Sequence, residues 1–285
     1  LLGGALTGVL NQTEPAVQVV VADSGCNGAP SQVATEFANR FAAAGIDYKV
    51  VRLAQAAKTG GTRQAGADYI LRPESPHPAT HIALCDGDDI WRPEKMARQM
   101  AYLRDNPDLG ILGTGAQNIN PSGQPCGALT MPSKIDPAVG QAEKAVADGQ
   151  IIQASGLVIS ANLWRQLGGY RTDLPTCEDV EFFVRACQVT RISYLNQILY
   201  DRLVHLDGIS HQSKWLQLCT DGCRIIVDHR DFFTRNQGRY PRHIRKVTHK
   251  FLHAGPAWSP GRKLPPVRLP DAFYHAIKPA AQLVY

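Results

Sequence analysis

Three carboxylates stand within four residues of this chain. Asp86, Asp88 and Asp89 follow the short apolar run His81 to Cys85, which is typical of a buried strand. Carboxylates crowded at the end of a strand repel one another, so burying them costs free energy unless a cation or hydrogen-bond donors neutralise them. Their hard oxygens suit Mg²⁺ or Mn²⁺, which complete their shell with water and substrate phosphates. The cluster predicts a metal and phosphate site; the alternative is a solvated acidic turn capping a helix from Pro93.

Strands and helices alternate in the first half of the chain, and this pattern sets the expected fold. Apolar runs and helical spacing predict strands at 17–21, 47–53 and 81–85 and helices at 31–44, 60–67 and 93–106. Such alternation predicts an α/β fold with a mostly parallel sheet flanked by helices. Because ligands bind beyond the carboxyl ends of parallel strands, Asp23 should lie on the same edge as the Asp86–Asp89 cluster.

A second acidic pair is expected at a helix N-terminus. The pattern predicts strands at 109–118, 152–160 and 192–204 and helices at 161–167 and 180–189. Gly168 and Gly169 form a strong stop signal for the first of these helices. Glu178 and Asp179 immediately precede the second helix, where the helix dipole favours negative charge.

The bulk composition is that of a globular chain. With 285 residues and 44% hydrophobic content, it can bury one large core or two smaller ones. We expect a cytoplasmic location, since no apolar run reaches about eighteen residues and the first residues lack the features of a signal peptide. The seven scattered cysteines indicate reduced thiols.

The net charge of +5 is concentrated near the C-terminus. From Phe232 to Pro270 there is no acidic residue, and basic side chains are interleaved with apolar ones. A basic amphipathic segment suits an anionic membrane surface, an acidic acceptor or nucleic acid. The alternative is a solvated helix face followed by a Pro-rich tail. Since no nucleic-acid motif accompanies the segment, we expect peripheral membrane contact through 232–270 and no nucleic-acid partner.

Five segments, in order, resemble the inverting family-two glycosyltransferases, which have the GT-A fold. The segments are Leu10-Asn11-Gln12-Thr13, Ala22-Asp23-Ser24-Gly25, Gly61-Thr62-Arg63-Gln64-Ala65-Gly66, Asp86 to Pro93, and Gly168-Gly169-Tyr170 followed by Glu178-Asp179 and Arg185. Their order makes the resemblance far more specific than any one motif. It departs from the family at Ala22, where the family has a first Asp, and at Gln64, which replaces Asn.

The resemblance implies a Rossmann-like GT-A domain over residues 1–211 and a C-terminal helical and basic tail over 212–285. Family members open with an apolar strand, whereas this chain begins inside the following helix, so we expect the first strand to be missing and the GT-A domain to be truncated at its N-terminus.

The resemblance also implies a donor site for a nucleoside-diphosphate sugar, with a UDP-sugar as the expected donor. Asp23 would accept a hydrogen bond from the base, Arg63 would lie near the base or the diphosphate, and Asp86 would lie near the ribose. Asp88, with Asp89, would hold the metal that bridges the phosphates.

By the same resemblance, Asp179 would be the catalytic base that takes the acceptor hydroxyl's proton, with Glu178 as the alternative. Adjacent carboxylates can raise one another's pKa toward a useful value. Both residues could instead only cap the helix. His205 would complete the metal shell, although His211 is close enough to compete for that role.

These features together lead us to expect an inverting, metal-dependent transfer of a sugar to a hydroxyl on a glycan or lipid-linked acceptor. The alternatives are a nucleotidyltransferase of similar fold and a non-catalytic truncated fragment. The acceptor should depend on the loop at 151–156 and on the weakly patterned region 121–149.

Overall fold

The computed structural model describes residues 1–24, 29–131, 135, 142–204, 215–242 and 244. The first half contains α1 (Leu2–Leu10), β1 (Gln18–Asp23), α2 (Ala29–Ala43), β2 (Asp47–Arg52), α3 (Thr59–Leu71), β3 (His81–Ala83), β4 (Ile90–Trp91) and α4 (Lys95–Asp105). The second half contains β5 (Leu109–Ile119), α5 (Glu143–Ala147), a 3₁₀ turn (Ala154–Gly156), β6 (Val158–Ser160), α6 (Ala161–Leu167), α7 (Glu178–Ala186), β7 (Arg191–Leu203), α9 (Trp215–Asp228) and α10 (Arg230–Asn236).

The expected α/β class with helix-flanked sheets is confirmed, but the strand pairing is mixed. β1 and β2 form a parallel two-stranded sheet, and a five-stranded sheet has the order β3-β6-β5-β7-β4. Within the larger sheet only β5 and β7 are parallel, and the other three pairings are antiparallel. The expected mostly parallel sheet rested on strand–helix alternation. That rule fails for β6, which enters antiparallel between β3 and β5 after a long connection, and for the short β4.

The predicted end of α6 agrees with the structure, whereas the strand predicted at 152–160 is a 3₁₀ turn at Ala154–Gly156 followed by a strand only at Val158–Ser160. α6 ends at Gly168, whose φ of +71° lies in the left-handed region that glycine adopts easily, so the stop signal is confirmed. Gly169 also has a φ of +71°, and a Cβ there would lie 2.0 Å from the Gln64 side-chain oxygen. That oxygen accepts a hydrogen bond from the Tyr170 amide at 2.8 Å, which joins α3 to the segment before α7.

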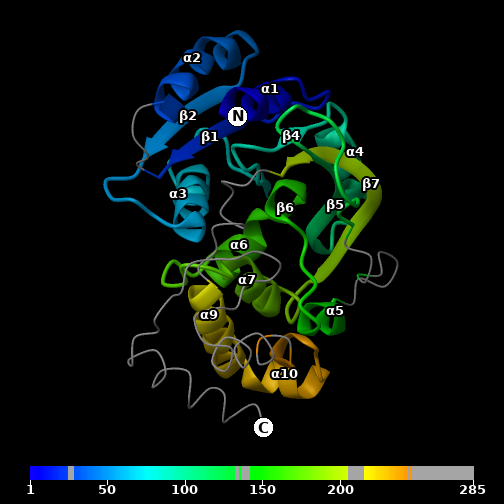
Figure 1. Cartoon of the computed structure of the whole chain (residues 1–285). Helices are drawn as coiled ribbons and strands as arrows, with labels where there is room; N and C mark the ends of the chain where they lie inside the picture. Colours follow the sequence, from blue (N-terminus) through cyan, green and yellow to red (C-terminus); the bar gives the residue numbers. More distant parts are fainter. Residues whose placement is uncertain (25–28, 132–134, 136–141, 205–214, 243, 245–285) are drawn as a thin grey trace, which may run out of the picture.

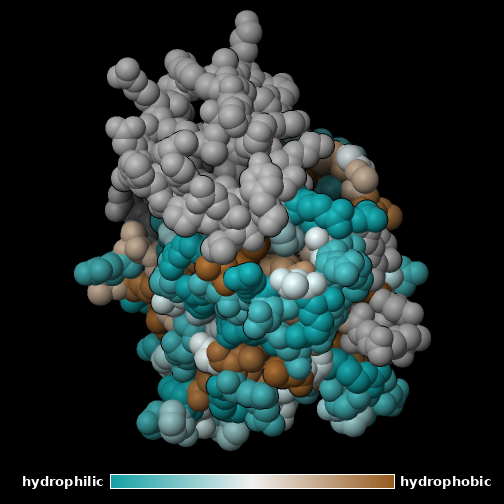
Figure 2. Space-filling model, turned by 90° about the horizontal axis from the view of Figure 1, so that it is seen from below, coloured by the Kyte–Doolittle hydropathy of each residue, from teal (hydrophilic) through white to brown (hydrophobic). Residues whose placement is uncertain are grey.

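The C-terminal helices share a hydrophobic core with the helices that precede them. Phe182 and Phe183 of α7, Val146 of α5, Ile225 of α9 and Phe232 of α10 belong to one buried cluster. Figure 1 shows α9 and α10 beside α5 and α7, at the end of the molecule away from β1 and β2. Figure 2 views the molecule from that end, where hydrophilic side chains cover much of the described surface and hydrophobic areas are small.

A second buried cluster packs beneath α1, α2 and α4. It includes Leu6 of α1, Phe41 of α2, Met96 of α4 and Tyr200 of β7. Among the described residues, no helix has both the length and the apolar character needed to cross a bilayer.

Candidate functional site

The acidic turn Asp86–Asp89 follows β3, as the sequence pattern predicted, and leads into β4, a short strand that the pattern did not predict. The Asp86 amide donates to the Ser155 hydroxyl at 2.9 Å, and the Asp89 amide donates to the Asp86 carbonyl at 3.2 Å. Ser155 belongs to the 3₁₀ turn and is fully buried. The main chain of the acidic turn is thus fixed both by its own hydrogen bond and by a neighbouring turn.

Asp89 is the most buried carboxylate of this turn. It is 6% exposed, and one of its side-chain oxygens accepts a hydrogen bond from the Leu203 amide at 3.1 Å, at the end of β7. Burial raises the pKa of Asp89 to about 7, and the nearby Asp86 and Asp88 carboxylates add to the rise. Hydrogen bonds from Ser155 and Leu203 favour the ionised form and limit the shift. Asp89 therefore ties the acidic turn to β7.

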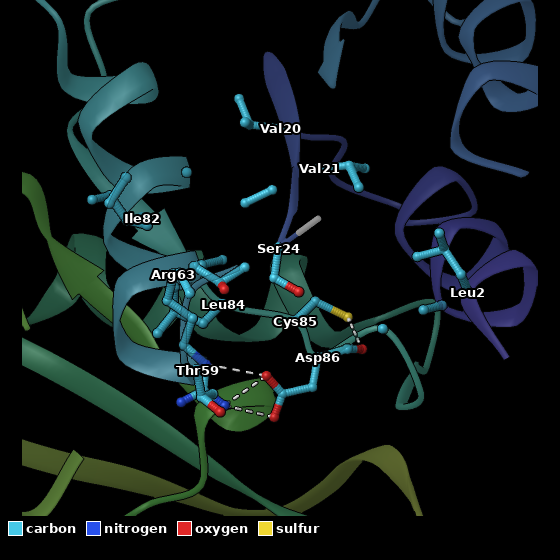
Figure 3. A pocket seen from close by; sticks show the side chains of 18 of the residues that line it. Leu2, Val20, Val21, Ser24, Thr59, Arg63, Ile82, Leu84, Cys85 and Asp86 are labelled. Carbon is cyan, nitrogen blue, oxygen red and sulfur yellow. Dashed lines mark hydrogen bonds and ion pairs between the residues drawn. The ribbon is translucent and has the colours of Figure 1, made fainter. Parts of the chain in front are cut away.

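Arg63 of α3 connects the two acidic segments of the chain. Its guanidinium donates to both oxygens of Asp86, at 2.7 and 2.8 Å, and to a Glu178 oxygen at 3.1 Å. The Arg63 side chain is 15% exposed and that of Glu178 is 7% exposed. Figure 3 shows the forked contact between Arg63 and Asp86. A planar guanidinium can bridge two carboxylates in this way, whereas an ammonium group is a point charge.

Glu178 and Asp179 form the first turn of α7, as expected. Burial raises the pKa of Glu178, Asp179 adds to the rise, and Arg63 opposes it. Burial likewise raises the pKa of Asp179, whose carboxylate accepts the Val180 amide at 2.8 Å. The close approach of α3 depends on Gly60, since a Cβ there would lie 2.8 Å from the Glu178 Cγ. A raised carboxylate pKa in a cleft is a property of candidate acid–base residues.

One cavity of about 590 Å³ is lined by both acidic pairs. Six of the predicted site residues reach it: Arg63, Asp86, Asp88, Asp89, Glu178 and Asp179. Part of its wall is apolar, from Ile151 before the 3₁₀ turn and from Leu218, Tyr240 and Ile244 in the C-terminal region. The volume lies within the range of ligand pockets, which usually combine apolar walls with a few convergent polar groups.

A larger cavity, of about 780 Å³, lies between β1 and β3 and shares Arg63 and Asp86 with the first. Val20 and Val21 on β1 and Ile82 and Leu84 at β3 line it, and Leu2 of α1 lies at one side (Figure 3). β1 pairs with β2, and β3 pairs with β6, so this cavity separates the two sheets.

Asp23 ends β1, but it is not among the residues that line either cavity, whereas its neighbours Ala22 and Ser24 line the larger one. His205 and His211 lie outside the described residues. Within the described part of the chain, no group of three His, Cys, Asp or Glu side chains has the arrangement of a metal site. The predicted set Asp88, Asp89 and His205 therefore includes a residue that the structure does not describe.

Two contributors to the site were not identified from the sequence. Ser155 holds the Asp86 amide, and Asp221 of α9 accepts the amide of Thr176, just before the second acidic pair. Neither belongs to a local motif, and only tertiary packing brings them to the site. The small residues around Ser155 (Ala154 and Gly156) are consistent with a tightly packed turn, but that signal is weak.

Comparisons with known proteins identify the fold. Residues 1–126 match the family described as Glycosyl transferase family 2. EpsE of Bacillus subtilis (strain 168), which carries the name of a glycosyltransferase, is 24% identical over 186 residues. That match covers 65% of this chain and 61% of the relative, so the chain spans about three fifths of the length of this curated relative.

Solved structures of similar fold cover most of the chain. S. aureus TarS 1–349 in complex with UDP matches with a TM-score of 0.55 and 15% identity, over 92% of this chain and 69% of that one. The mannosyltransferase PcManGT from Pyrobaculum calidifontis, in complex with GDP-Man and Mn²⁺, has a TM-score of 0.57 and 15% identity, over 98% and 75%. GalNAc-T7 with UDP, GalNAc and Mn²⁺ has a TM-score of 0.54 and 14% identity, over 80% and 46%.

The sheet order, the helix-flanked architecture and these similarities agree with the resemblance found in the sequence motifs. The chain has the GT-A fold, and its first 126 residues match the family described as Glycosyl transferase family 2.

Proposed function

We propose that the chain transfers a sugar, with inversion and with the help of a divalent metal, from a nucleoside-diphosphate donor to a hydroxyl group. The acceptor is a glycan or a lipid-linked molecule, and the donor is a UDP-sugar. The observation that carries the proposal is the single cavity lined by both acidic pairs and by Arg63. Similar folds bind nucleotide ligands, since TarS was solved with UDP and PcManGT with GDP-Man and Mn²⁺.

The donor set on the acidic turn fits a hard divalent cation. Asp88 lines the cavity beside Asp89, and carboxylate oxygens are the ligands that Mg²⁺ and Mn²⁺ prefer. In our proposal Asp88 is the principal ligand of the metal, and Asp89 and His205 are its other protein ligands. A bound metal would neutralise charge on the departing diphosphate.

The donor would lie across the acidic turn. Asp86 is assigned to the ribose, Asp23 to the base and Arg63 to the diphosphate or base. Arg63 pairs with Asp86 and Glu178, and these ion pairs fix its charge in the wall of the cavity. A fixed guanidinium at this place favours a ligand that carries phosphate.

Asp179 is assigned as the base. The acceptor oxygen forms a bond to the anomeric carbon, its proton moves to the Asp179 carboxylate, and the nucleoside diphosphate leaves with the electron pair of the broken bond. Glu178, whose pKa burial also raises, is the alternative, but its carboxylate accepts a hydrogen bond from Arg63 at 3.1 Å, which holds it toward the guanidinium. The raised pKa of Asp179 supports the assignment.

Sugar transfer by single-residue variants tests the proposal. Asp88→Asn and Asp179→Asn should each lower kcat by about 10²- to 10⁴-fold, because each removes a charge needed at the reacting centre. Asp108→Asn is the matched control, since Asp108 is exposed and pairs with Arg191 at the surface. Unchanged kcat in either test variant would remove that residue's assigned role.

Two further measurements separate the alternatives. Release of pyrophosphate rather than a nucleoside diphosphate would indicate a nucleotidyltransferase. Calorimetry with UDP and Mn²⁺ that detects no binding would favour a non-catalytic fragment.

We also propose a cytoplasmic location with peripheral attachment to an anionic membrane through 232–270. Of this segment the structure describes 232–242 and 244, where Phe232, Tyr240 and Ile244 are buried. Sedimentation with liposomes should depend on anionic lipid and weaken with salt. Sedimentation that is independent of both would rule out this attachment.

A further inference from the structure

The residue before the second acidic pair has an unusual backbone conformation. Cys177 has φ of 60° and ψ of 17°, in the left-handed region that few residues other than glycine adopt. It is the N-cap of α7, and its carbonyl accepts the Glu181 amide at 3.1 Å. Its side chain makes no capping hydrogen bond. A side chain persists in this region only where the surrounding structure fixes it.

A buried carboxylate from α9 fixes the neighbouring residue. One oxygen of Asp221 accepts both the Thr176 amide, at 2.9 Å, and the Thr176 hydroxyl, at 2.8 Å. Its other oxygen accepts the Gln217 side-chain amide at 3.0 Å. Asp221 is 0% exposed, and besides these donors its charge has a longer contact with Arg224, at 3.8 Å, so the loss of the Thr176 donors would weaken the pairing of a buried carboxylate.

The second acidic pair is therefore held from two sides. On one side, Arg63 and the close approach of Gly60 fix Glu178 to α3. On the other side, Asp221 fixes Thr176, which precedes the left-handed Cys177. Rotation at Thr176 or Cys177 would swing the first turn of α7 and move both carboxylates.

We propose that Asp221 is a positioning residue for Glu178 and Asp179, acting through the Thr176–Cys177 turn. Through Asp221, α9 contributes to the geometry of the site, although α9 lies outside the segment that matches the family. The kinetic test of this inference rests on the proposed function, whereas the test by amide hydrogen exchange does not.

Substitution of Asp221 with measurement of amide hydrogen exchange over 174–181 tests the geometry without substrate. Asp221→Ala should speed exchange at Thr176 and in the first turn of α7, and Asp221→Asn should preserve most of the protection because its side-chain oxygen can still accept from Thr176. Thr176→Val removes only the hydroxyl bond, so it tests the same contact if Asp221→Ala does not fold. Asp228→Asn, an exposed carboxylate on the same helix, is the control.

Kinetics test the consequence for the reaction. Asp221→Ala should lower kcat by about 10²-fold, since a small misplacement of a catalytic group has an effect of this size. The KM for the donor should change by less than about threefold, because Asp23, Asp86 and Asp88, three of the residues assigned to the donor and its metal, lie outside α7 and the Thr176–Cys177 turn. Asp221→Asn should restore most of kcat, and Cys177→Gly added to Asp221→Ala should recover about fivefold, since glycine adopts the left-handed region without penalty.

The two readouts have separate outcomes. If the native chain transfers no sugar but Asp221→Ala loosens Thr176 to Glu181, the positioning role stands and the proposed function fails. If exchange over 174–181 in Asp221→Ala and Thr176→Val matches that of Asp228→Asn, the positioning role is wrong. It is also wrong if an active native chain keeps its kcat within twofold in Asp221→Ala.

Discussion

The two acidic pairs at the cavity are stabilised by different means. In the first pair, Asp89 is bonded by an uncharged donor, the Leu203 amide, and Arg63 contacts this turn at the neighbouring Asp86. The Glu178–Asp179 pair depends on a full positive charge, Arg63, and on the N-terminus of α7.

This difference separates two tasks that buried carboxylates can perform. Asp89 is bonded to a neutral amide, and burial raises its pKa to about 7, so an incoming cation would stabilise its charged form. A carboxylate that pairs with a guanidinium already has a positive charge beside it, so its role is to fix the positions of the neighbouring residues. The comparison thus favours the first pair as the place of the proposed metal.

Removal of Arg63 should lower the free energy of unfolding more than either of the two substitutions that follow. Arg63→Met leaves Glu178 and Asp86 without their shared cation, so the free energy of unfolding should fall by about 3 kcal/mol. Chemical denaturation measures the change. Arg92→Met is the matched control, because Arg92 is 41% exposed in its pair with Asp201 and should cost less than about 1 kcal/mol. Equal losses in the two variants would contradict the distinction between the pairs.

Lys95 should make a smaller contribution to the free energy of unfolding, and this contribution should depend on pH. It is fully buried behind the acidic turn, where its ammonium group donates to Gln99 at 2.7 Å and lies 4.0 Å from the centre of the Trp91 ring. Burial lowers the pKa of Lys95 to about 7, and the nearby Cys85 opposes the shift. This cation, unlike Arg63, is bonded to an amide oxygen rather than to a carboxylate.

The sign of this effect follows from proton binding. Between pH 7 and the ordinary lysine pKa, the unfolded chain binds a proton that the folded chain does not, so stability should rise with pH. From pH 7 to pH 9 the rise should be about 2 kcal/mol, and Lys95→Met should abolish it. Thermal unfolding at several pH values measures both chains. The same slope in the native chain and in the variant would show that Lys95 is charged in the folded state.

Ser155 should give the smallest effect. Ser155→Ala leaves the Asp86 amide without its acceptor, which should cost about 1 kcal/mol of unfolding free energy and loosen the acidic turn. Ser122→Ala, at an exposed turn, is the control and should change stability by less than about 0.5 kcal/mol. Differential scanning calorimetry of both variants measures the costs. No difference between them would show that the 3₁₀ turn does not hold the acidic segment.

The elements that carry the two acidic pairs could be predicted from the local sequence. The apolar run before Asp86 predicts the strand that delivers the first acidic pair, and the helical spacing after Asp179 predicts the helix that carries the second. Gly168 and Gly169 predict the end of α6, which the structure confirms. In each case neighbouring residues determine the outcome through backbone preference or periodicity.

The remainder depends on contacts between distant segments. Nothing near Ser155 or Asp221 indicates that either is buried against an acidic segment, because burial arises only when α9 and the 3₁₀ turn are packed in place. The direction of β6 was likewise not predictable from alternation, since a strand of three residues has little pattern of its own. Long-range packing, rather than local preference, decides these features.

The contact between Asp221 and Thr176 also bears on the order in which the chain can fold during synthesis. Asp179 leaves the ribosome well before Asp221 of α9 is made. At synthesis rates of roughly 5 to 20 residues per second, this interval lasts several seconds. During that time the left-handed turn at Cys177 lacks its anchor, so the acidic pair can reach its final geometry only after most of the described chain has been made.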